Sequence, residues 1–408
     1  MRLNNIRQLW LNYYQNKGFK KIKSAPLVHP AFPRAFNMSA GLVQLDSRIR
    51  SAKKIKPSKE CLVQKCVRYF DIPKVGDNSH LSFFEMAGAF EIVEFKREKT
   101  IMDCWNFLTR KLGLDPQKIW ITAFNKDKIL NTKISLDSNL KKFLLGLTGK
   151  KLVLGNKETN FWTQGGGAEL TDNIKLCGPQ VEFFYQIKKL KTSDNPLSSP
   201  DKFLEISNTL FIEYYIDFNK SPVLKKLINP STETVIGLER TALVFENKKD
   251  LFQTLFFSPL IKIINKKLNS EVKIIVDHLK SLVFILAEEK ILPGKKDRNR
   301  IIKTLTRRLL SSFYLLKIDH KKVLPRLIKE LIKIYSPVYP EIKNCQKTVS
   351  EVIDYSEEKY LKTLNKAKKE IKKYLETNNI KKISPKEKQL FWSKYGISEK
   401  ILKLLEIF

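Results

Sequence analysis

Two arginines and an aromatic run have residue types and an order suited to phosphate chemistry. Arg68 ends an apolar stretch shortly before the run FFEMAG at residues 83–88, and Arg240 follows a glycine in the sequence GLER. Two guanidinium groups can neutralise a triphosphate and orient its α-phosphorus, while an aromatic face stacks on adenine. An arginine among apolar strand residues needs an anionic partner. Arg68 and Arg240 are therefore our strongest candidates for holding ATP.

The first part of the chain must supply the elements that position these residues. Residues 1–245 mix helical segments with short β-rich runs at 120–124, 151–154 and 181–185, separated irregularly by glycine and proline. This pattern predicts an antiparallel sheet flanked by helices rather than regular βαβ repeats. No GxGxxG follows a strand, which argues against a dinucleotide-binding fold. We therefore predict an α+β domain over residues 1–245.

Residues 246–408 are predicted to form an all-α domain. Apolar residues recur at helical spacing in several segments, which are 261–267, 272–289, 298–316, 321–334 and 348–377. Ser384, Pro385 and Glu387 form a helix start signal, with serine as the N-cap. Gly396 then divides the final helical pair.

The first segment of the chain is predicted to be a core-facing helix that Gly18 ends. Its apolar residues recur at helical spacing and are Ile6, Leu9, Trp10, Tyr13 and Tyr14. The absence of acidic residues before Asp46 is also typical of organellar import sequences. We prefer the helix, and we predict a cytoplasmic location.

The charge balance points to a polyanionic partner. Lys and Arg total 76 against 42 Asp and Glu, so the formal charge is +34. Such a surplus suits nucleic acid. The alternative is mutational bias, because the excess is mostly lysine alongside many Asn and Ile residues.

The cysteines and histidines exclude several classes of protein. The five cysteines form no CxxC pair, and there are only four histidines, so we expect no tetrahedral zinc site. An odd number of cysteines fits a reducing compartment. Apolar runs such as 282–287 are too short to cross a bilayer, so we expect no membrane partner.

The segment 298–316 has an apolar stripe with basic residues on another face. Arg300, Lys303 and Arg307 lie off the stripe, and Arg308 adds a further positive charge. Such charges usually form a solvated face of a core helix. In an already basic helical domain they favour contacts with a phosphate backbone.

Together these motifs resemble the N-terminal part of the alanyl-tRNA synthetase family, which belongs to the class II aminoacyl-tRNA synthetases. The resemblance covers nearly the whole chain in order. The matching segments are 25–33 and 39–42 (motif 1), 66–68 with 83–90 (motif 2), 160–162, 177–179 with Glu182, 205–208, 237–240 (motif 3), 276–281 and 395–396.

The resemblance implies a class II antiparallel sheet and ATP-dependent, AMP-forming activation of alanine with Mg²⁺. Arg68 would bridge the alanine carboxylate and the α-phosphate, and Arg240 would face adenine or the γ-phosphate. Phe84 or Phe90 would stack on adenine. The remaining implied ATP contacts, to sugar, adenine or Mg²⁺, are Glu85, Glu182 and Met86.

The implied alanine pocket has other members. Trp162 and Asn208 resemble residues that bound it, and Glu233 stands where the family has the aspartate that binds the amino group, with Gly237 nearby. Each aromatic residue also has an alternative role as a core residue.

Several positions depart from the family pattern. Ser79 and Leu81 replace a basic residue and a histidine in motif 2, Ser207 replaces a tryptophan, and Val235 replaces a glycine in motif 3. Glu233 would still bind an ammonium group, one methylene further out. These changes bear on catalytic efficiency more than on the class of ligand.

The helical domain would recognise tRNA(Ala) through the basic residues above. Asp297 and Ser393 stand where the family reads a G·U pair with an asparagine and an aspartate. A carboxylate accepts a hydrogen bond from guanine but cannot donate one as asparagine does. Because the chain ends near the family's tRNA-recognition helices, we expect a monomer that lacks the zinc-dependent editing domain.

We thus predict an alanine–tRNA ligase that forms alanyl-adenylate and transfers alanine to the 3′ end of tRNA(Ala). Val235 and Ser79 favour an alternative, a catalytically impaired paralogue that binds tRNA. A third hypothesis, a ligase that charges a protein carrier, would not need the basic helical domain.

Overall fold

The computed structural model describes residues 3–30, 34–36, 38–165, 173–380, 383–395 and 399–404. The contacts within it divide these residues into two compact units. Unit 1 holds the described residues up to 68, except 34 and 35, together with 84–256. Unit 2 holds 34, 35, 69–83 and the described residues from 257 onward. The break thus falls after Phe256, and the segment 69–83 groups with the helices that follow it.

Unit 1 is built on a nine-stranded sheet in the described part of the chain, with strand order β1-β2-β3-β11-β10-β9-β4-β7 and β8 paired to β9. The strands are β1 (Lys20–Lys21), β2 (Ser58–Val67), β3 (Phe83–Ile92), β4 (Ile119–Phe124), β7 (Leu152–Gly155), β8 (Phe161–Thr163), β9 (Ile174–Gln186), β10 (Phe203–Asp217) and β11 (Val223–Gly237). The centre from β3 to β4 is antiparallel, as the sequence predicts. The edge pairs β1–β2 and β4–β7 are parallel, so the sheet as a whole is mixed.

Helices cover one face of this sheet. Among the described residues, α1 (Leu3–Gln15), α3 (Arg97–Asn106) and α6 (Leu238–Phe245) lie on this face. Contacts from α1 and α3 to β3 and β10 mark the covered face: Arg7 binds Glu85, Thr100 binds Glu91, and Cys104 contacts Ser207.

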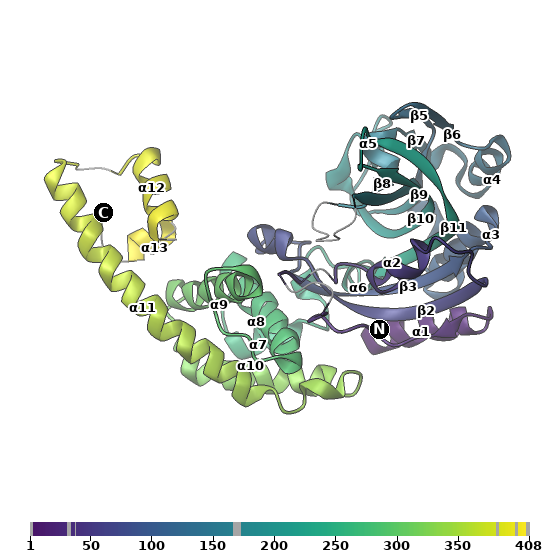
Figure 1. The fold of residues 1–408 in the computed structure, drawn as a ribbon. Helices are drawn as coiled ribbons and strands as arrows, with labels where there is room; N and C mark the ends of the chain where they lie inside the picture. Colours follow the sequence, from purple (N-terminus) through teal and green to yellow (C-terminus); the bar gives the residue numbers. More distant parts are fainter. Residues whose placement is uncertain are drawn as a thin grey trace. The chain divides into compact units, whose positions relative to one another are not determined.

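The predicted first helix is confirmed as a core element. Helix α1 lies along β2 (Figure 1), and Trp10 is fully buried. The chain leaves the helix through Gly18, whose φ of +84° suits glycine.

Smaller elements complete unit 1. They are α2 (Asp46–Ile49), α4 (Ser138–Thr148), α5 (Lys157–Asn160) and the hairpin of β5 (Lys126–Ile129) and β6 (Thr132–Ser135). A short helical turn at Gly41–Leu45 precedes α2 and packs on the opposite face of the sheet with Leu62 and Phe90.

The described part of unit 2 is almost entirely helical, as predicted. Its helices are α7 (Ser258–Ile264), α8 (Ser270–Glu288), α9 (Asp297–Leu315), α10 (His320–Tyr335), the long α11 (Gln346–Thr377), α12 (Pro385–Tyr395) and α13 (Glu399–Leu404) (Figure 1). The predicted start signal of α12 is confirmed, because the Ser384 N–H donates to the Glu387 carboxylate at 2.7 Å. Gly396 lies outside the described residues. No helix in the described ranges has the length and apolar character needed to cross a membrane.

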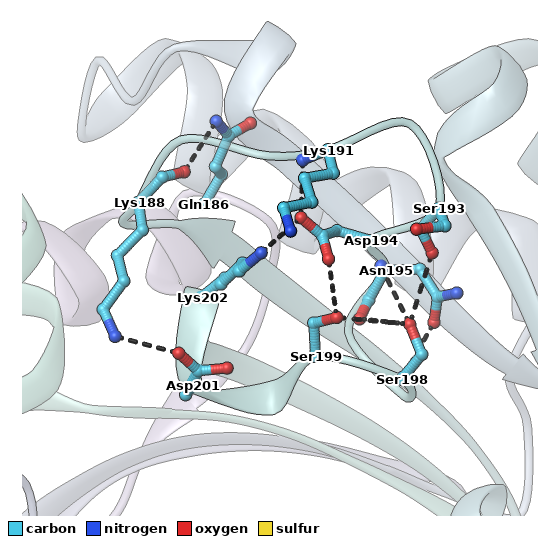
Figure 2. Close-up of polar contacts among 10 residues, drawn as sticks. All are labelled: Gln186, Lys188, Lys191, Ser193, Asp194, Asn195, Ser198, Ser199, Asp201 and Lys202. Atoms are coloured by element: carbon cyan, nitrogen blue, oxygen red, sulfur yellow. Dashed lines mark hydrogen bonds and ion pairs between the residues drawn. The ribbon is translucent and has the colours of Figure 1, made fainter.

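The long loop between β9 and β10 is held by one carboxylate (Figure 2). Asp194 is 8% exposed and accepts hydrogen bonds from the Lys202 ammonium at 2.5 Å, the Lys191 N–H at 2.5 Å and the Ser199 hydroxyl at 2.8 Å. The Lys202 ammonium, followed by the Lys191 N–H, lowers the pKa of Asp194 to about 2. The ionised carboxylate is therefore the form that orders this loop.

We expect Asp194→Asn to loosen the loop without unfolding unit 1. The variant removes the charge that three donors share, so amide hydrogen exchange over 187–202 should become faster at neutral pH. Asp201→Asn is the matched control, because Asp201 pairs with Lys188 at an exposed site of the same loop. The lowered pKa means that the contribution of Asp194 is present above pH ~4 and is lost as the pH falls toward 2. Equal exchange in the two variants would contradict this role.

Candidate active site

The face of the sheet opposite α1, α3 and α6 carries a row of side chains that the pairing register places directly opposite one another. Gly88, Val235, Asn208, Glu182 and Thr122 are successive partners across β3, β11, β10, β9 and β4. Directly opposed residues of antiparallel strands point to the same face. Motifs far apart in the sequence therefore meet on one surface.

Glu182 is the carboxylate at the centre of a polar cluster on this row. It accepts hydrogen bonds from the Thr122 hydroxyl at 3.0 Å, the Gln180 amide at 3.0 Å and the Asn160 amide at 3.5 Å. Burial, with the neighbouring charge of Glu205, raises the pKa of Glu182 to about 8. The three donors are all neutral, and burial with the charge of Glu205 favours the protonated form of Glu182.

Glu205 joins the cluster because of a β-bulge. Regular alternation from Asn208 would place Glu205 on the covered face. A register shift between Glu205 and Ser207 instead sets Glu205 opposite Phe184, which shares the face of Glu182. The Glu205 carboxylate forms an ion pair with Arg240 at 3.2 Å, and both side chains are about one-third exposed. Glu205 is not among the site residues predicted from the sequence, although it lies in a segment that matched the family.

Arg68 and Phe84 form the other part of the site. The Arg68 guanidinium lies over the Phe84 ring, 4.8 Å from its centroid, and the Nε atom donates to the Ser39 carbonyl at 3.4 Å. Among the described residues, no carboxylate lies within ion-pair distance of Arg68, so most of its donors are available to an anion. Free donors are what an arginine needs to bind phosphate, and the role of Arg68 in holding ATP stays a prediction.

Glu233 lies near Arg68 but is sealed from solvent. It is 3% exposed, and its Oε1 accepts the Leu42 N–H at 3.1 Å. Burial raises the pKa of Glu233 to about 7, while the Leu42 N–H and the Arg68 charge act in the opposite direction. A ligand ammonium group would have to displace or share this local contact.

Phe90 is a core residue in this structure. This corrects the prediction that Phe90 is one of the two aromatic residues that could stack on adenine. Its ring is 1% exposed and packs in a cluster with Leu42, Leu62 and Leu210. Phe84 is only half-buried, so it is the aromatic residue with a face available for stacking.

Asn208 presents an unsatisfied acceptor on the row. Its Nδ2 donates to Gln180 at 3.1 Å, while its Oδ1 is buried without a hydrogen-bond partner in the described part of the chain. A buried carbonyl oxygen without a donor is costly. A ligand that brings an N–H group would satisfy it.

Three more predicted residues lie along the same face. Met86 is paired with Gly237 across β3 and β11, and Trp162 is paired with Gly178 across β8 and β9. Gly178 is required by close packing, because a Cβ atom there would lie 1.8 Å from the Phe211 carbonyl oxygen. Strand β9 thus lies very close to β10 at Gly178, and β8, which carries Trp162, pairs with β9 at this same residue.

Glu85 is a correction to the predicted ATP contacts. It alternates with Phe84 and Met86, so its side chain points to the helix-covered face. The carboxylate is fully buried and binds Arg7 of α1, with both oxygens 2.6 Å from Nη2. It is a structural ion pair and not a nucleotide ligand.

The predicted tRNA residues fall into two groups within unit 2. Arg300 is exposed on α9, and Lys303 and Arg307 are half-buried on it. Burial, followed by the charges of Arg307, Lys295 and Arg300, lowers the pKa of Lys303, so these residues form a basic cluster. Asp297 at the start of α9 and Ser393 on α12 are exposed.

Arg308 departs from the prediction. Its Nε donates to the His278 Nε2 atom at 3.0 Å, and its Nη2 donates to the Val75 carbonyl at 2.9 Å. These bonds commit the guanidinium to contacts inside unit 2, so it does not present its charge to a phosphate backbone. Arg307 points differently, toward Tyr360 and Thr363 of α11.

The chain is similar to known proteins over almost its whole length. The model of the family "tRNA synthetases class II (A)" matches residues 5–406. The chain is 29% identical to the alanine–tRNA ligase of Thermotoga maritima over 96% of this chain and 45% of that protein. It is 30% identical to that of Thermotoga petrophila over 89% of this chain and 42% of that protein, and 29% identical to that of Nitrosomonas europaea over the same shares. The chain thus spans less than half the length of these relatives.

We expect Glu85→Ala to lower the free energy of unfolding by roughly 3–5 kcal/mol, because it removes the carboxylate of a buried ion pair and leaves the charge of Arg7 less well compensated. Urea unfolding measures this loss. Glu213→Ala is the control, since its ion pair with Arg97 is partly exposed and should contribute about 1 kcal/mol. Unchanged stability with weakened ATP binding would instead make Glu85 a ligand.

The raised pKa values of Glu182 and Glu233 predict a pH dependence. The folded state binds protons that the unfolded chain releases near pH 4.5, so the free energy of unfolding should fall as the pH rises from about 4.5 to 8. Glu182→Gln should make this decline less steep. The free energy of unfolding of the variant should therefore rise relative to that of the wild type toward pH 8. Urea unfolding at about pH 5, 6.5 and 8 tests this. Parallel curves for the two proteins would show that Glu182 does not retain its proton.

Proposed function

The chain belongs to the class II (A) family of tRNA synthetases, and from this premise we propose that it activates alanine with ATP and transfers the alanyl group to the 3′ end of tRNA(Ala). The observation that carries the proposal is the row on the face of the sheet opposite α1, α3 and α6. It brings Glu182, Asn208 and Val235 from three separate motifs into one line, with Glu233 on the same face.

The first step needs positioned charge and no protein nucleophile. An oxygen of the alanine carboxylate attacks the α-phosphorus, the bond to the bridging oxygen of the β-phosphate breaks, and pyrophosphate leaves. Negative charge that builds on the α-phosphoryl oxygens is stabilised by fixed cations. Arg68 would do this, and two observations support the role: Phe84 supports its guanidinium, and its donors are largely free. Arg240 would neutralise adjoining phosphate, with Glu205 holding it in place.

The Mg²⁺ that accompanies ATP would be held by Glu182 and Glu205. Carboxylate oxygens are the ligands that Mg²⁺ prefers. The pair suits a cation because the charge of Glu205 helps to raise the pKa of Glu182, and a cation would relieve that repulsion. When bound, Mg²⁺ neutralises phosphate charge. Glu182 would release its proton as the ion enters.

Alanine would bind beside this pair. Its ammonium group matches the unsatisfied Oδ1 atom of Asn208 and the carboxylate of Glu233. Trp162 and Val235 would bound the pocket for the methyl group and exclude larger side chains. Val235 replaces the smaller glycine of the family, so this pocket is narrower on the β11 side.

The basic cluster of α9 supports tRNA binding. Arg300, Lys303 and Arg307 of α9, with Lys295 just before the helix, concentrate positive charge in one part of a chain whose formal charge is +34. Such a cluster binds phosphate backbones without reading sequence. The bound tRNA would receive the alanyl group from the adenylate as AMP leaves.

Alanine-dependent exchange of pyrophosphate into ATP tests this proposal before tRNA is added. We expect exchange with alanine, and we expect Arg68→Ala to lower it by at least about 100-fold while the protein stays folded. Serine and glycine serve as competing amino acids. Folded wild-type protein that supports no exchange with any amino acid would overturn the proposal in favour of a non-catalytic paralogue that binds tRNA.

A further inference from the structure

The segment 69–83 connects Arg68 and Phe84, the two residues proposed to contact ATP, but its own contacts group it with unit 2. Arg68 directly precedes it, and Phe84 directly follows it. Strand β3 begins at Phe83, the last residue of the segment, and continues into unit 1. Contacts that hold the segment therefore act on Arg68 and Phe84 through the chain itself.

A fully buried polar cluster holds the end of this segment on α8. Asp277 accepts the Ser82 N–H at 2.9 Å, and the Ser82 hydroxyl donates to its other carboxylate oxygen. The Ser82 and Ser281 hydroxyl oxygens lie 2.8 Å apart. All three residues are 0% exposed. A buried carboxylate depends on its donors, so Ser82 is fixed two residues before Phe84.

Arg308 extends this cluster to α9. The His278 Nδ1 atom donates to Asp277 at 2.9 Å, and the His278 Nε2 atom accepts from Arg308. The Nε2 atom can accept this hydrogen bond only in the neutral ring, and burial lowers the pKa of His278, which favours that form. The same guanidinium binds the Val75 carbonyl in the middle of the segment. A continuous chain of hydrogen bonds thus joins α9, α8 and residues 75–82.

Further contacts anchor the rest of the segment. Lys273 donates to the Asn78 side chain at 2.7 Å, and the Phe83 ring stacks on Phe284 with centroids 4.1 Å apart. Gly76 has a φ of +121°, and a Cβ atom there would lie 3.3 Å from Ser270. The segment is therefore attached to α8 from its middle to its end.

We propose that Ser82, Asp277 and Arg308 are positioning residues for ATP: they hold the segment 69–83 and so keep Arg68 over Phe84. None of them touches a substrate. The inference rests on the proposed function, because it assigns Arg68 and Phe84 to ATP. It also moves Arg308 from tRNA binding to the adenylation step.

The physical reason is preorganisation. The guanidinium of Arg68 and the ring of Phe84 belong to opposite ends of one connecting segment, and their stacking requires both ends to be in place. A loose segment would have to be ordered each time ATP binds, and that entropy loss would weaken ATP binding. An anchored segment has lost that freedom on folding.

Pyrophosphate exchange measured against ATP concentration tests the inference without tRNA. We expect Ser82→Ala and Arg308→Gln each to raise the KM for ATP roughly fivefold, the effect of one net hydrogen bond. Ser356→Ala is the matched control for Ser82→Ala. It removes a buried hydroxyl of unit 2 that donates only to the Val352 carbonyl of its own helix. Thermal melts correct for lost stability, because a merely structural defect lowers the active fraction and leaves KM unchanged.

Hydrogen exchange separates this inference from the proposed function. Amides of 84–88 should exchange faster in Ser82→Ala and Arg308→Gln than in Ser356→Ala, whether or not the wild type activates alanine. If the wild type does not exchange pyrophosphate into ATP, that result counts against the proposed function and not against the positioning role. Unchanged amide exchange and an unchanged KM for ATP would overturn the positioning role. Loss of tRNA charging by Arg308→Gln with a normal KM for ATP would return Arg308 to tRNA binding.

Discussion

The buried ion pair between Arg7 and Glu85 determines which face of the sheet is free to do chemistry. It joins α1 to β3 with both carboxylate oxygens 2.6 Å from one guanidinium nitrogen, and it lies beneath a helical layer. Because side chains alternate along a strand, fixing Glu85 against α1 turns Phe84 and Met86 to the other face. A charge pair with no chemical role thus sets the orientation of every site residue on β3.

The site then follows from register. Successive strand pairs set Val235, Asn208 and Glu182 side by side, although they are separated by many residues in the chain. One irregularity completes the arrangement, because the bulge after Glu205 turns that carboxylate toward Glu182 and Arg240. Two carboxylates, an arginine and an unsatisfied amide oxygen then share one surface. These groups are the basis on which we propose that the surface binds a charged ligand with an amino group and a cation.

The buried polar residues of α8 hold a connecting segment in place, whereas those of the sheet form the candidate site. Asp277, His278 and Ser281 are fully buried in a helix that is otherwise apolar over most of its length. Buried polar groups are costly unless they are satisfied, and here each finds a partner in the segment 69–83, in α9 or in α8 itself. The buried polar groups of unit 2 therefore fix the position of the segment 69–83. Apolar packing alone would allow this segment to shift along α8.

The sequence by itself determined the elements and the family. Helical spacing predicted α1 and most helices of unit 2, and glycine, proline and β-rich runs predicted strands such as β4 and β9, because these signals are local. Ordered motifs made Arg68, Asn208 and Arg240 candidates for the site. The tertiary structure alone decided that Glu85 and Arg308 are internal partners, that Phe90 belongs to the core and that Glu205 joins the site. Those outcomes depend on register, on a bulge and on contacts between residues far apart in the chain, and the order of residues along the chain does not encode them locally.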